Sequence, residues 1–161
     1  MVKCKTEKKK PSGYHFTECG LDYIYLLNGY EEENDPDYGK LFTIHNSDEL
    51  HEEIARNILL YKEKFEAQEV KFFRSLLRLT QKQLGELLDA DARTVQHWEG
   101  ANDKQQITPA YESLLRILIW EKYLDESKAF EFFEQNKASR THYKAIEMQE
   151  SNDHWTATIA A

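Results

Sequence analysis

Two short runs of aromatic and aliphatic residues near the start of the chain, 14–18 and 21–27, flank the turn signal Cys19-Gly20. This arrangement is typical of a β-hairpin. A third run, 40–44, predicts another strand, and the acidic stretch 31–37 predicts a loop because its side chains cannot pack. Together these segments predict a small antiparallel sheet, which needs a helix on one face to be stable.

A helix that could cover this sheet follows directly. Asn46 is a favourable N-cap residue, and Glu49 three positions later completes a capping-box pattern. Apolar residues then recur at helical spacing until about residue 65, at Leu50, Ile54, Ile58 and Tyr61. We expect their common face to pack against the strands.

Residues 68–124 show helical spacing throughout, apart from a polar loop over 100–107. Thr80 and Asp91 are placed to cap two short helices, and Thr108-Pro109 opens a longer one. The apolar positions expected inside the first three helices are Phe72, Leu76, Leu77, Leu84, Leu87, Leu88, Val95 and Trp98.

The helix over 108–124 is apolar over more of its surface than one core contact needs. Part of it is therefore expected to meet a second subunit. Its candidate dimer residues are Leu118, Trp120 and Tyr123. The alternative is that the whole helix is intramolecular core.

The C-terminal part of the chain changes from helical to alternating spacing. A further helix is expected over about 126–135, and alternation around a turn signal at 151–153 predicts a hairpin over about 143–159. A frayed helix followed by a disordered tail is the alternative to this hairpin. The predicted fold class is α+β, with a small N-terminal antiparallel sheet and its covering helix, an all-α domain and a C-terminal hairpin. The expected divisions are a flexible basic arm (1–13), a small acidic domain (14–66), a helical domain (67–136) and an extension (137–161).

The composition is that of a globular protein, since 40% of the 161 residues are hydrophobic and 31% are charged. No apolar run reaches the ~18–20 residues that a membrane span needs, and no apolar signal segment follows the N-terminal lysines. Two cysteines, Cys4 and Cys19, do not make a disulfide framework. The expected location is therefore the reducing cytoplasm, with no membrane partner.

The net charge of −8 argues against a nucleic-acid partner only if the charge is spread evenly. It is not, because residues 14–66 carry thirteen acidic and four basic side chains, whereas residues 67–105 carry six of each. A neutral segment can bind DNA when its few cations face one way.

Residues 74–101 (RSLLRLTQKQLGELLDADARTVQHWEGA) contain two short capped helices joined by a tight turn. Asp89 stands where that turn favours a left-handed backbone, and Ala90 is small enough to lie between the helices. This stretch resembles the XRE, or lambda-repressor-like, helix-turn-helix family. The matching residues are Leu79, Thr80, Gln81, Leu84, Leu87, Val95, Trp98, Glu99 and Gly100.

The resemblance implies that the helix over 91–99 lies in the major groove of double-stranded DNA. The outward positions are then Ala92, Arg93, Thr94, Gln96 and His97. Arg93 suits a guanine edge and Gln96 an adenine. The candidate phosphate contacts are Gln81, Lys82 and Arg78. Each could instead be a solvated surface group.

Two further residues match family positions with a structural role. Arg74 and Glu99 are implied to form an ion pair that holds the recognition helix and touches no base. A homodimer would place two recognition helices about one helical turn apart on DNA, which requires a palindromic operator.

A second resemblance, to bacterial regulators related to MqsA-type antitoxins, rests on YHFTECGLDYIYLLNGY (14–30) and DYGKLFTIHNSDELHEEIA (37–55). In MqsA a zinc-binding N-terminal domain binds the toxin. This chain lacks the two cysteine pairs that such a site needs, so we expect no metal and no cofactor. The acidic region 14–66 could attract a small basic toxin, and the alternative is that its acids only keep the domain soluble.

An enzyme is not expected. The segment HEEIA (51–55) resembles half of a metalloprotease motif, but Ala55 stands where the second histidine ligand should be. The expected function is a sequence-specific transcriptional repressor that acts as the antitoxin of a type II toxin–antitoxin module. A stand-alone phage or mobile-element repressor without a toxin, and a protein-interaction adaptor that has lost DNA binding, remain as alternatives.

Overall fold

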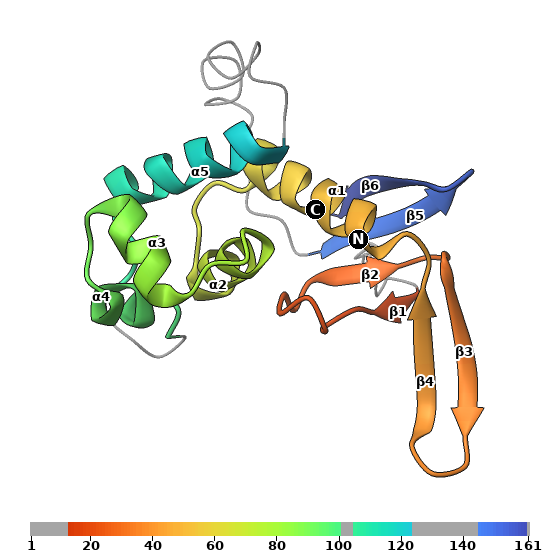
Figure 1. Cartoon of the computed structure of the whole chain (residues 1–161). Coiled ribbons are helices and arrows are strands. Elements are labelled where there is room, and N and C mark those ends of the chain that lie inside the picture. Colours follow the sequence, from red (N-terminus) through yellow and green to blue (C-terminus); the bar gives the residue numbers. More distant parts are fainter. Residues whose placement is uncertain (1–12, 101–104, 124–144, 161) are drawn as a thin grey trace, which may run out of the picture.

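The computed structural model describes residues 13–100, 105–123 and 145–160, and its fold is of the predicted α+β class (Figure 1). The elements in chain order are β1 (Tyr14–His15), β2 (Ile24–Leu26), β3 (Tyr30–Asp35), β4 (Gly39–Ile44), α1 (Ser47–Tyr61), α2 (Ala67–Leu76), α3 (Gln81–Leu88), α4 (Ala92–Trp98), α5 (Pro109–Tyr123), β5 (Ala145–Ser151) and β6 (His154–Ala160). The predicted arm before Gly13 and the predicted helix over 126–135 lie outside the described residues.

One four-stranded sheet, in the order β1-β2-β5-β6, is built from both ends of the chain. The predicted N-terminal hairpin is confirmed, since β1 pairs antiparallel with β2, although both strands are shorter than expected. The predicted C-terminal hairpin is confirmed as well, since β5 pairs antiparallel with β6. β5 lies parallel to β2, with Ile24 opposite Ile146. The C-terminal hairpin therefore extends the N-terminal sheet.

The prediction of a loop over 31–37 is wrong for residues 31–35. Residues Tyr30–Asp35 form β3, which pairs with β4 in a separate two-stranded sheet from Tyr30↔Ile44 to Asp35↔Gly39. The strand expected over 40–44 therefore does not join the larger sheet. The hairpin projects away from the body (Figure 1). Acidic side chains on its solvent-exposed faces stay hydrated and do not interrupt the backbone hydrogen bonds that pair β3 with β4.

α1 covers the sheet with the predicted face, since Leu50, Ile54 and Ile58 are all fully buried. The predicted capping box at its start is wrong. Asn46 has a left-handed backbone (φ 42) and does not cap the helix through its side chain. Its amide donates instead to the Glu49 carboxylate and to the carbonyl oxygen of Asp153, 3.0 Å away, which ties the start of α1 to the β5–β6 turn.

The helices α2 to α4 carry the predicted apolar faces, with one exception. Leu84, Leu88, Val95 and Trp98 are buried, as expected. Leu87 was expected inside α3, but its side chain is 57% exposed. α3 has only eight residues, and its core contact is already filled by Leu84 and Leu88, one turn apart.

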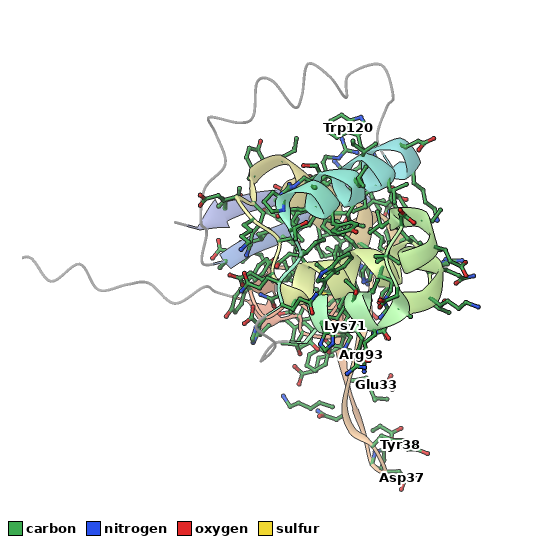
Figure 2. The ribbon with its side chains drawn as sticks, turned by 90° about the vertical axis from the view of Figure 1, so that its left-hand side faces the viewer. Glu33, Asp37, Tyr38, Lys71, Arg93 and Trp120 are labelled. Atoms are coloured by element: carbon green, nitrogen blue, oxygen red, sulfur yellow. The ribbon has the colours of Figure 1, made fainter. Side chains whose placement is uncertain are left out.

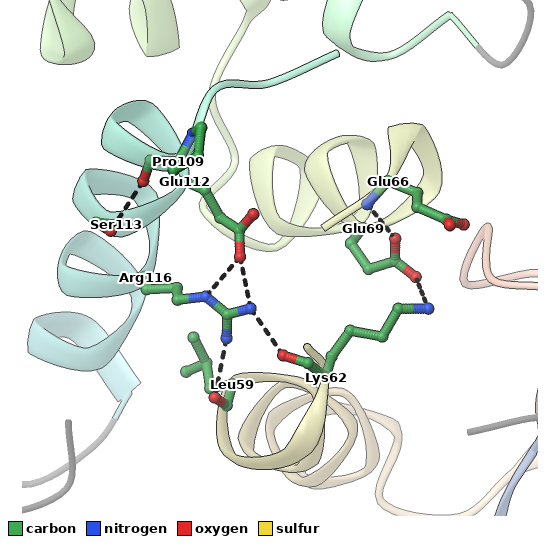
Figure 3. Close-up of polar contacts among 8 residues, drawn as sticks. All are labelled: Leu59, Lys62, Glu66, Glu69, Pro109, Glu112, Ser113 and Arg116. Atoms are coloured by element: carbon green, nitrogen blue, oxygen red, sulfur yellow. Dashed lines mark hydrogen bonds and ion pairs between the residues drawn. The ribbon is translucent and has the colours of Figure 1, made fainter. Parts of the chain in front are cut away.

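A buried polar cluster joins α1, α2 and α5 (Figure 3). Arg116 of α5 donates to the carboxylate of Glu112 and to the carbonyl oxygen of Lys62 at the end of α1. The Lys62 ammonium lies 3.2 Å from the carboxylate of Glu69 in α2, which also accepts a hydrogen bond from the Tyr23 hydroxyl. The helical part and the sheet are thus connected by polar contacts that are almost fully buried.

Candidate nucleic-acid interface

The α3–turn–α4 unit is held by local capping. The Thr80 hydroxyl accepts from the backbone N–H of Gln83, and the Gln83 side chain accepts from the backbone N–H of Thr80. The Asp91 carboxylate accepts from the backbone N–H of Thr94 at 2.7 Å, and this bond lowers the pKa of Asp91. Asp89 adopts the predicted left-handed backbone (φ 54). Both helices therefore begin where the capping residues predicted.

The close approach of the α3 backbone to the turn depends on Gly85, a residue that the capping and periodicity signals do not single out. A Cβ at this position would lie 2.5 Å from the carbonyl oxygen of Ala90. The backbone N–H of Ala90 bonds to the carbonyl oxygen of Gly85 at 2.9 Å. A glycine inside a helical pattern was the available signal, because such a glycine usually marks a close contact.

The predicted base-reading side chains divide into two groups. Ala92, Arg93 and Gln96 are exposed, whereas Thr94 and His97 are half-buried. Figure 2 shows the Arg93 side chain at the margin of the helical body, pointing outward. The opposite side of α4 is fixed by Val95 and by Trp98, whose ring lies 4.8 Å from that of Tyr111. One face of α4 therefore carries exposed polar side chains, and the opposite face is packed into the core.

Arg74 and Glu99 form the ion pair that the family resemblance implied. Two guanidinium nitrogens of Arg74 bond to the two carboxylate oxygens of Glu99, with the Nη2–Oε2 distance at 3.1 Å. Arg74 also donates to the carbonyl oxygen of Leu79 at 2.9 Å. The pair links α2 to the start of α3 and to the end of α4.

The three predicted phosphate contacts are not brought together. The Gln81 amide donates to Glu99 at 2.9 Å, so this side chain extends the ion-pair cluster. Lys82 is exposed and lies 3.8 Å from Glu86. Arg78, in a left-handed conformation (φ 57) after α2, lines a separate pocket that also includes Glu52 of α1. Of the three, Lys82 is the exposed cation on the α3–α4 unit itself.

The three side chains expected at a dimer surface make contacts within the chain. Trp120 is buried and Leu118 is half-buried against the core. The Tyr123 hydroxyl donates to the carbonyl oxygen of Leu76 at 2.6 Å. The exposed apolar side chains of α5 are instead Leu114 and Ile117. Of the three predicted positions only Trp120 is buried, and the most exposed apolar surface of α5 lies at Leu114 and Ile117.

The β3–β4 hairpin holds the densest negative charge of the acidic region, with five carboxylates between residues 30 and 44 against one lysine. Register puts Glu31, Glu33 and Asp35 on one face of the ribbon. Glu32 lies on the other face and pairs with Lys40. The tip residue Tyr38 is 81% exposed, and Figure 2 shows it far from the body. The hairpin therefore concentrates negative charge on an exposed two-stranded ribbon.

Within the described ranges, no three histidine, cysteine, aspartate or glutamate side chains are grouped so as to hold a metal ion. Cys19 is a free, half-buried thiol, and burial raises its pKa to about 11. None of the helices in the described part of the chain has the length and apolar character to cross a membrane.

Comparison with models of protein families, with curated proteins and with solved structures finds no match.

Proposed function

We propose that this chain is a sequence-specific DNA-binding transcriptional repressor with an XRE-type, lambda-repressor-like helix-turn-helix. The observation that carries the proposal is the outer face of α4, where Arg93 and Gln96 are exposed. The inner face of the same helix is fixed by Trp98 and by the Arg74–Glu99 pair. An exposed polar face on a rigidly held short helix is what major-groove reading requires.

The operator is proposed to be a palindrome bound by two copies of the chain. One α4 offers few base contacts, so two recognition helices are needed for useful specificity. The test is binding of the purified chain to the DNA upstream of its own gene, measured by fluorescence anisotropy. A scrambled duplex of equal length is the control. Equal affinity for both duplexes at physiological salt would contradict sequence-specific repression.

Arg93→Ala is expected to cost ~1–3 kcal/mol of DNA binding at one base position, because a bidentate contact to a guanine edge is lost. The measurement is affinity for a set of single-base operator variants. Lys40→Ala is the matched control, since it removes one positive charge from the β3–β4 hairpin. Loss of affinity to the same degree on every variant would show that Arg93 does not read a base.

Lys82→Ala is expected to weaken binding on all sequences alike, because Lys82 is an exposed cation on α3 and lies loosely beside Glu86. Loss of one phosphate contact should make the slope of log K against log[salt] shallower by about 0.9. The slope is measured between low and physiological salt, with Lys40→Ala again as the control. An unchanged slope would remove Lys82 from the phosphate contacts.

We further propose that the repressor is the antitoxin of a type II module, with a small basic toxin as partner. The support is the exposed acidic face of the β3–β4 hairpin, whose field would attract a cationic protein. A variant carrying Glu31→Lys, Glu33→Lys and Asp35→Lys should lose its complex with a basic protein encoded beside its gene. Co-purification and titration calorimetry measure this loss. Retention of full affinity would show that the hairpin is not the contact.

A further inference from the structure

The outer edge of β6 is not paired with another strand in the part of the chain that the structure describes. β6 is the last strand of the sheet, and no described strand lies beyond it. Its pairing with β5 runs without interruption from Ser151↔His154 to Ala145↔Ala160, so the strand has no bulge. A long, regular edge strand is a template for pairing with another strand.

The hairpin turn identifies which backbone groups face outward. Asn152 and Asp153 both have positive φ (53 and 64), as in a two-residue type I′ turn. The closing pair Ser151↔His154 is then hydrogen-bonded, and bonded pairs alternate with non-bonded pairs along an antiparallel ladder. Trp155, Ala157 and Ile159 therefore direct their N–H and C=O groups to the open edge.

The side chains of β6 do not protect this edge. Exposed edge strands usually carry lysine, proline or a bulge that discourages pairing. In a chain of net charge −8, residues 155–160 (WTATIA) contain no charged side chain and no proline. By contrast, the edge strand β3 bears glutamates at three successive positions, which would repel a second copy.

The order of residues along β6 is nearly symmetric about Ala157. Thr156 and Thr158 flank it, and Trp155 and Ile159 lie one position further out. If two copies pair antiparallel about a two-fold axis at Ala157, Thr156 of one faces Thr158 of the other. Trp155 then faces Ile159, and every outward N–H and C=O of the three edge residues finds a partner. Threonine pairs and aromatic–β-branched pairs are favourable across strands.

We propose that β6 is an interaction surface for a second copy of this chain, with the two β6 strands joined antiparallel about Ala157. This contact leaves α4 free, because α4 and β6 lie on opposite sides of the molecule (Figure 1). It does not depend on DNA binding, so it can be tested on the protein alone.

The first test is disulfide cross-linking, in a background where Cys4 and Cys19 are replaced by serine. Thr156→Cys and Thr158→Cys chains are oxidised separately and as a mixture. Only the mixture should give a linked dimer, because residues 156 and 158 face each other while two copies of the same position are too far apart. No linkage in the mixture, or equal linkage in each chain alone, would overturn the proposal.

The second test is mass in solution, by light scattering with circular dichroism to confirm folding. The double variant Thr156→Lys/Thr158→Lys places lysines of the two copies opposite each other across the two-fold axis. Their repulsion should weaken the dimer, so the average mass should fall below that of the unmodified chain. Mixing it with Thr156→Glu/Thr158→Glu should restore the mass. Ile117→Glu on α5 is the control and should not break this contact. An unchanged mass in the lysine variant would overturn the proposal.

Discussion

Arg116→Met is expected to lower the free energy of unfolding by about 3–5 kcal/mol, the usual cost of breaking a buried ion pair from one side. The Arg116 side chain is 2% exposed and bonds twice to one oxygen of Glu112, at 2.7 and 2.9 Å. It also donates to the carbonyl oxygens of Leu59 and Lys62, at 3.0 and 2.9 Å. Methionine fills much of the volume but leaves the Glu112 carboxylate and both carbonyl groups without this donor.

Urea unfolding measures this loss. For a chain of this size the midpoint of thermal unfolding should fall by about 10 °C, at about 2–4 °C per kcal/mol. Arg56→Met is the matched control, since Arg56 pairs with Glu53 at the surface and should cost at most ~1 kcal/mol. The double variant Arg116→Met/Glu112→Leu should recover part of the loss, because it removes the stranded carboxylate. A loss below 1 kcal/mol in the single variant would contradict this account.

Arg74→Met is expected to lower unfolding free energy by about 3 kcal/mol, near the lower end for a buried pair because Arg74 keeps some solvent contact. Glu99 would lose both guanidinium bonds and keep the hydrogen bond from the Gln81 amide. The carbonyl oxygen of Leu79 would lose its donor as well. Since these contacts fix the end of α4 and the start of α3, the proposed DNA binding should weaken, although the proposal gives Arg74 no contact with a base.

Affinity measurements on operator variants can distinguish the positioning role proposed for Arg74 from the base-reading role proposed for Arg93. Arg74→Met should weaken affinity for all single-base operator variants in proportion, whereas Arg93→Ala should change the preference among them. Arg74→Lys is the control for charge, because lysine keeps the cation but cannot make the two-pronged contact to Glu99. If Arg74→Lys matched the unmodified chain in both stability and affinity, the guanidinium geometry would not be what holds α4.

Local signals predicted the α3–turn–α4 unit because the determinants of its helix starts and of its turn lie within a few residues. Thr80 and Asp91 cap their helices through backbone groups three positions away. Asp89 tolerates the left-handed turn through its own short polar side chain. Such interactions do not depend on the rest of the fold, so spacing alone was enough to place them.

The same local signals could not predict contacts between segments that lie far apart in the sequence. The alternation in 143–159 predicted a hairpin, but not that β5 would join β2, some 120 residues earlier in the chain. The exposure of Leu87 and the burial of Trp120 depend on which neighbours fill the core, so helical spacing could not assign them.

The sequence by itself therefore determined the positions of α1 to α5, the β1–β2 and β5–β6 hairpins, and the caps and turn of the α3–α4 unit, because these depend on neighbouring residues. Only the tertiary structure decided which strands share a sheet, which side chains of α4 and α5 face solvent, and that Gln81 bonds to Glu99. The physical reason is that burial and pairing are set by segments that meet only after the chain has folded.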